Sequence, residues 1–158
     1  MNTVDLTMFT TEFLTEALYG LGFLAFILLL DTFLFVQILI WFKRYCERSH
    51  GAPQFKYLWR FMACVLLLCI VQLLSILLWT WGIYAKGLMD NLTTTLLFVG
   101  SCYTTLGVYS DLLPKGWRFM ALYIAISGLF TFAMATSAMI SMVGSFAKAQ
   151  QPVNKESP

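Results

Sequence analysis

A short polar break, Thr104-Thr105-Leu106-Gly107-Val108-Tyr109-Ser110-Asp111, separates two long apolar segments of this chain. Two threonines, a glycine, a tyrosine and an aspartate fall within eight residues, whereas the flanking segments are mostly aliphatic and aromatic. Inside a bilayer, non-helical backbone is tolerated only where it is buried in protein or lines a water-filled cavity. The break therefore carries most of the functional information, provided that the chain is a membrane protein.

The composition is that of a membrane protein. Of the 158 residues, 59% are hydrophobic and 11% are charged, and the mean hydropathy is +0.77. Average globular proteins carry about 25% charged residues. The net charge of +2 is too small and too dispersed to indicate a nucleic-acid partner. The length fits one small domain.

The sequence shows no pattern of an enzyme or of a resident metal. The cysteines fit neither a disulfide framework nor a CxxC metal site. A nucleophile–base pair, a carboxylate dyad and a phosphate-binding glycine loop are all missing from the sequence. We therefore expect no catalytic site and no cofactor.

Three segments are long and apolar enough to cross a bilayer, which takes about 20 residues per helix. They run over residues 18–42, 61–84 and 117–146. A fourth apolar piece, residues 92–102, is too short to cross and predicts a re-entrant or buried helix. Residues 1–17 have apolar positions at helical spacing and predict a separate amphipathic helix on the membrane surface, with Glu16 on its polar face.

The charges predict the orientation. Residues 43–60 form a basic loop with five lysines and arginines, which the positive-inside rule places in the cytoplasm. The N-terminus is then outside and the C-terminus inside, with 147–158 as a disordered cytoplasmic tail. We expect a multi-pass protein of the plasma (inner) membrane. The loop Lys43–Arg60 could also bind anionic lipid.

Residues 91–105 predict a pore helix that enters from the outer face. Asp90 or Asn91 is its expected N-cap, because either side chain can accept the free backbone N–H groups of the first turn. The C-terminal end of this helix would point to the middle of the membrane, where the negative end of its dipole favours a cation.

With these segments in place, residues 61–146 resemble the outer helix, pore loop and inner helix of the potassium-channel superfamily. The family filter reads Thr-aliphatic-Gly-aromatic-Gly-Asp, and Thr105-Leu106-Gly107 match its first half. Tyr109 and Asp111 match the second half only if Val108 is an insertion, and Ser110 then replaces the second glycine. Without the insertion, Val108 replaces the aromatic residue and Tyr109 replaces the second glycine. The span over 18–42 is extra to the family unit.

The resemblance implies a set of site residues. Those expected to coordinate the permeant ion, K⁺ or Na⁺, are Thr104, Thr105, Leu106, Gly107, Val108 and Tyr109, with Ser110 and Asp111 at the outer mouth. Gly128 lies 21 residues after Gly107, close to where the family's inner helices often carry a hinge glycine. It is a candidate hinge or, alternatively, a close-packing site. Small and weakly polar neighbours of Gly128 predict a helix that lines a cavity or packs closely.

Asp31 lies near the middle of the first span. A carboxylate there costs about 2.5–3.5 kcal/mol on insertion scales and indicates a functional site by default. Ion passage or proton sensing is one interpretation. The interpretation that we favour is a hydrogen bond to a neighbouring helix, with Gln72 or Thr80 as the expected partner.

The sequence therefore predicts an all-α membrane protein with three transmembrane helices, a re-entrant pore helix and a filter loop. One pore loop cannot surround an ion, so the expected assembly is a homotetramer that conducts cations with weak potassium selectivity. The alternative is a channel-like scaffold or accessory subunit that does not conduct and assembles with other membrane proteins.

Overall fold

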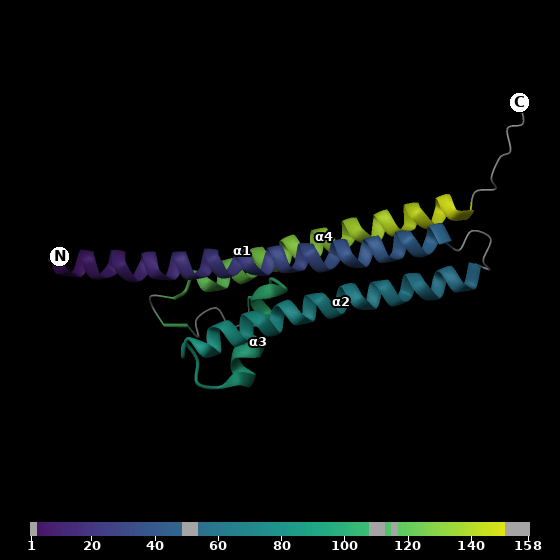
Figure 1. Ribbon diagram of the computed structural model, residues 1–158. Coiled ribbons are helices and arrows are strands. Elements are labelled where there is room, and N and C mark those ends of the chain that lie inside the picture. Colours follow the sequence, from purple (N-terminus) through teal and green to yellow (C-terminus); the bar gives the residue numbers. More distant parts are fainter. Residues whose placement is uncertain (1–2, 49–53, 108–112, 115–116, 151–158) are drawn as a thin grey trace, which may run out of the picture.

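The computed structural model describes residues 3–48, 54–107, 113–114 and 117–150. Within these residues every regular element is a helix (Figure 1). The helices are α1 (Thr3–Arg48), α2 (Gln54–Ala85), α3 (Leu92–Tyr103) and α4 (Met120–Gln150). Three of them contain segments long and apolar enough to cross a membrane: Leu14–Arg48, Phe55–Ala85 and Met120–Lys148. The prediction of an all-α fold is confirmed for the described residues, and three helices are long and apolar enough for a multi-pass membrane protein.

The long helices pack through narrow stripes and leave most of their apolar surface uncovered. In α1, the buried residues recur at spacings of three or four along much of the helix. They are Glu16, Gly20, Leu24, Ile27, Asp31, Phe35, Phe42 and Cys46. Many of the remaining leucines and phenylalanines of the three helices are exposed. Such a surface suits helices whose outer faces contact lipid rather than water.

The contacts between helices define the topology. Glu16 contacts Met120 and Thr32 contacts Met134, in the same order along both helices, so α1 and α4 run parallel. Figure 1 shows them side by side. Between α1 and α2 the order is reversed, because Tyr19 bonds to Gly82 whereas Tyr45 packs on Tyr57. The α2 helix is therefore antiparallel to both.

The core consists of two apolar clusters stacked along the bundle. The first lies around Trp79, Phe98 and Ile124 and includes the buried face of α3. The second lies around Phe42, Leu68 and Met142 and contains no residue of α3. The short helix α3 therefore packs in only one half of the bundle, against α2 and α4.

The ends of the helices differ from the expected boundaries. The expected surface helix over 1–17 is not separate, because α1 is continuous from Thr3. Most of the expected basic loop 43–60 is helical, since α1 ends at Arg48 and α2 begins at Gln54. The third long helix starts at Met120 rather than at residue 117, and it continues to Gln150, into the segment expected to be a disordered tail. Apolar patterning finds the membrane-crossing part of a helix, but helices extend beyond the bilayer at little cost.

Glu16 is the clearest single departure. It was expected on an exposed polar face, but the side chain is 2% exposed and its Oε1 accepts the backbone N–H of Met120 at 3.1 Å. Met120 is the first residue of α4, and its N–H is shared between Glu16 and the carbonyl of Trp117, which lies 3.3 Å away. Glu16 thus caps α4 from a distant part of the sequence, and its charge complements the positive end of that helix.

Candidate functional site

The candidate site begins with the local structure of α3. Asn91 is the N-cap residue, and its side chain accepts the backbone N–H of Thr93 at 2.9 Å. This agrees with one of the two expected caps. The buried face of the helix carries Thr95, Phe98, Val99, Ser101, Cys102 and Tyr103. These residues pack against α2 and α4, and this packing determines where the C-terminal end of α3 lies.

The C-terminal end of α3 is a Schellman turn. The N–H of Leu106 bonds to the carbonyl of Ser101 at 2.8 Å, and the N–H of Thr105 bonds to the carbonyl of Cys102 at 3.0 Å. Thr105 has a φ of 60°, in the left-handed region that glycine favours at this position of the turn. A threonine there is strained, and such strain persists only where the surroundings enforce it. The N–H of Gly107 also bonds to Ser101, at 3.2 Å, so the chain stays close to the helix end.

Tyr103 anchors this end of α3 to α4. Its hydroxyl lies 2.6 Å from the hydroxyl of Thr131. Its carbonyl oxygen lies 2.0 Å from the point where a Cβ on Gly128 would be. Thr131 is about 17 Å along α4 from its first residue, at a rise of about 1.5 Å per residue. The α3 helix therefore runs from one end of the bundle to a depth of about 17 Å, a little more than a third of the length of α4, and the chain then returns to the start of α4.

Gly128 is thus a close-packing residue in this structure. Of the two roles expected from the sequence, the contact with Tyr103 accounts for its lack of a side chain without a hinge. The nearby Ser127, Thr131, Ala135 and Ala138 are buried inside the single chain. These small residues bring helices together rather than face a cavity.

Residues 104–107 form an exposed surface at this depth. Thr104, Thr105 and Gly107 are exposed, and Leu106 is 72% exposed. Gly107 has a φ of 65°, so its lack of a side chain is used here for conformation rather than for space. The expected site residues Val108, Tyr109, Ser110 and Asp111 lie outside the described residues.

A layer of buried polar side chains lies at the same level and separates the two apolar clusters. Asp31 is 1% exposed, and its Oδ1 accepts the hydroxyl of Ser75 at 2.6 Å. Tyr103 lies close enough to both for an electrostatic interaction. Ser127 and Thr131 contribute from α4. All four helices therefore meet in one polar layer.

Two oxygens of this layer have no hydrogen-bond partner within the described part of the chain. They are Oδ2 of Asp31 and the hydroxyl oxygen of Ser127. Buried polar atoms are nearly always paired, so such atoms mark a site that water or another group completes. No lysine, arginine or histidine pairs with Asp31 among the described residues.

The partner of Asp31 differs from the expected one. Thr80 instead bonds to the carbonyl of Ile76 in its own helix at 2.8 Å, and Gln72 is only half-buried. Ser75 was missed, although it lies on the buried stripe of α2 that Leu68 and Val71 define. The helical period of that stripe is the signal that could have found it.

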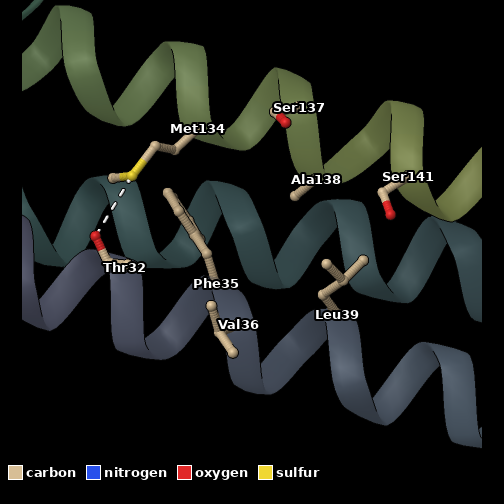
Figure 2. Close-up of a pocket in the computed structure, with 8 residues that line it drawn as sticks. All are labelled: Thr32, Phe35, Val36, Leu39, Met134, Ser137, Ala138 and Ser141. Carbon is tan, nitrogen blue, oxygen red and sulfur yellow. Dashed lines mark hydrogen bonds between the residues drawn. The ribbon is translucent and has the colours of Figure 1, made fainter.

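A groove between α1 and α4 lies on the other side of the polar layer. It has a volume of about 270 Å³, and Phe35, Leu39 and Ala138 are among its lining residues. Figure 2 shows Thr32 at one end, with its hydroxyl bonded to the sulfur of Met134. The groove does not reach α3, so it is separate from the candidate site. Among the described residues there is also no cluster of His, Cys, Asp and Glu that could hold a metal ion.

Comparison with protein-family models, curated proteins and solved structures gives no match to this chain.

Proposed function

We propose that this protein is a subunit of a homotetrameric cation channel that resembles the potassium channels, with residues 104–111 around the central axis. The observation that supports the proposal is the exposed segment 104–107. Tyr103 holds it about 17 Å along α4 from the first residue of that helix, a depth inside the bilayer core of about 30 Å. An isolated chain would leave this non-helical backbone facing lipid.

Exposure to lipid is the physical problem that an oligomer solves. A polar backbone group without a partner costs several kcal/mol in hydrocarbon, and irregular backbone survives at that depth only in protein or beside water. A central axis shared by four copies supplies both. Thr104 and Thr105 also gain from such an axis, because they are exposed and their hydroxyls bond only to nearby carbonyls, at 2.7 Å each.

The segment also offers the oxygens that a cation needs. The carbonyls of Thr105 and Leu106 accept no hydrogen bond from the described residues. Rings of such carbonyls replace the hydration shell of a permeant ion. The C-terminal end of α3 adds the negative end of a helix dipole. The substrate in this proposal is K⁺ or Na⁺, and potassium selectivity is weak because Ser110 or Tyr109 occupies the place of the second filter glycine.

One face of α4 is not covered by the described residues of its own chain and is available to neighbouring subunits. Exposed residues at helical spacing line that face: Leu129, Ala133, Thr136, Ile140 and Val143. The α1 helix covers a different side of α4, so the extra helix does not block the arrangement. In the proposed tetramer this face turns toward the axis or an adjacent subunit.

The mass of the assembly tests the proposal. Native mass measurement of the full chain in mild detergent should give four copies. A tetramer supports a shared axis around residues 104–111. A strictly monomeric protein would rule out the pore, because one segment cannot enclose an ion. The channel-like scaffold that assembles with other membrane proteins remains the alternative, and flux measurements distinguish it from the channel.

A further inference from the structure

An arginine clamped between two aromatic rings lies at the opposite end of the bundle from α3. The guanidinium carbon of Arg60 is 4.4 Å from the ring centre of Trp41 and 4.6 Å from that of Tyr45. Both distances are within about 6 Å, the range of cation–π attraction. Nε of Arg60 is buried and has no hydrogen-bond partner among the described residues. The two rings thus hold a guanidinium whose hydrogen-bonding capacity is not fully used.

Other basic side chains surround this clamp. Arg44 and Arg48 follow Trp41 and Tyr45 at spacings of three or four residues, so they share that face of α1. Lys56 precedes Arg60 by one helical turn on α2. Arg44, Arg48 and Lys56 are exposed. No carboxylate pairs with any of these cations in the part of the chain that the structure describes.

The surroundings place the clamp at the depth of lipid headgroups. Trp41 is 43% exposed and Trp59 is 72% exposed, and both lie near the ends of membrane-length segments. Tryptophans with apolar rings and polar N–H groups gather at this interface. The exposed side chains of Phe55 and Leu58 contact the same region of the bilayer in this arrangement.

We propose that Arg60 is the centre of a binding site for the phosphate of an anionic lipid headgroup. A guanidinium that already packs against two rings loses little further freedom when it binds phosphate through two parallel N–H groups. Arg44, Arg48 and Lys56 add attraction to a negatively charged leaflet. A lipid is the occupant, rather than a soluble phosphate, because the site opens between two membrane-crossing helices and beside exposed aromatic side chains.

Lipid retention by the purified full chain tests this site. The protein is placed in nanodiscs of phosphatidylcholine with or without phosphatidylglycerol, and retained lipids are counted by native mass spectrometry. We expect Arg60→Gln to weaken phosphatidylglycerol binding about tenfold, since a charged, two-point phosphate contact is lost. Lys43→Gln is the matched control, because it removes one charge from another face of α1, and the expected loss is less than twofold.

Three outcomes would contradict the proposed lipid site. Equal losses in Arg60→Gln and Lys43→Gln would overturn the site and leave only diffuse surface charge. Displacement of phosphatidylglycerol by millimolar inorganic phosphate would overturn the assignment to lipid. Arg60→Lys keeps the positive charge but loses the two parallel N–H groups of the guanidinium. Binding close to that of the unmutated chain would therefore also contradict the proposal. None of these results depends on whether the protein conducts ions.

Discussion

The carbonyl oxygen of Tyr103 occupies the space that a side chain on Gly128 would need. The two residues belong to different helices, α3 and α4, and the oxygen lies 2.0 Å from the position of an added Cβ. Such a distance is far below any real contact, and the atom is backbone, so it cannot move without moving the end of α3. The glycine therefore sets how closely the two helices approach and where residues 104–107 lie.

Gly128→Ala should displace the C-terminal end of α3. We expect the free energy of unfolding to fall by about 1–3 kcal/mol, as for other insertions into a packed interior. Gly144→Ala is the control on the same helix, because an added Cβ there meets nothing within 4 Å. Thermal unfolding of both variants in detergent measures the difference. Equal stability of the two variants would show that α3 does not pack on α4 in this way.

Ser75→Ala should destabilise the polar layer, because it removes the one hydrogen bond that Asp31 makes among the described residues. Leaving a buried group unpaired costs about 1–3 kcal/mol. Asp31→Asn keeps an acceptor oxygen for Ser75 and should lose much less stability, with cation flux unchanged. Ser145→Ala is the control, since its hydroxyl bonds only within its own helix.

Unfolding in detergent and flux in liposomes separate the two interpretations of Asp31. A large loss of flux in a stable Asp31→Asn protein would contradict the structural role and favour ion or proton passage.

Glu16→Ala should fray the start of α4. The variant removes the side-chain acceptor for the N–H of Met120 and leaves it only the carbonyl of Trp117, and loss of a helix cap costs about 0.5–2 kcal/mol. Glu16→Gln keeps an acceptor oxygen but not the charge, so its effect should be smaller. Glu47→Ala is the control, an exposed acid on the same helix. Hydrogen exchange at residues 120–123 is the measurement, and unchanged protection in Glu16→Ala would disprove the cap.

The orientation of the bundle is predicted from the basic residues near the end of α1 and the start of α2. Thiols introduced singly at Thr7 and Gln150, in a background without the native cysteines, should react with an impermeant reagent from opposite sides of the membrane. The thiol at residue 7 should react from outside and the one at residue 150 from inside. The reverse pattern would mean that α3 enters the membrane from the cytoplasmic side.

The sequence predicted what depends on local composition. Hydropathy found the three membrane-crossing segments, and the short length of 92–102 separated α3 from them. The cap at Asn91 followed from local side-chain chemistry. Three other features, by contrast, depend on contacts between helices: Glu16 at the start of α4, Ser75 beside Asp31, and Tyr103 against Gly128. Each joins residues far apart in the chain, and local patterns do not specify which partners meet.

Ion flux through the unmutated protein tests the central claim most directly. Purified protein in liposomes should pass K⁺ and Na⁺ with little discrimination, because the second half of the filter pattern is incomplete. Gly107→Ala should abolish the flux, since its φ of 65° is unfavourable for a residue with a Cβ, whereas Gly100→Ala in α3 should leave it intact. A stable tetramer that passes neither ion would contradict the channel and favour the scaffold, and strong potassium selectivity would contradict our interpretation of Val108 to Ser110.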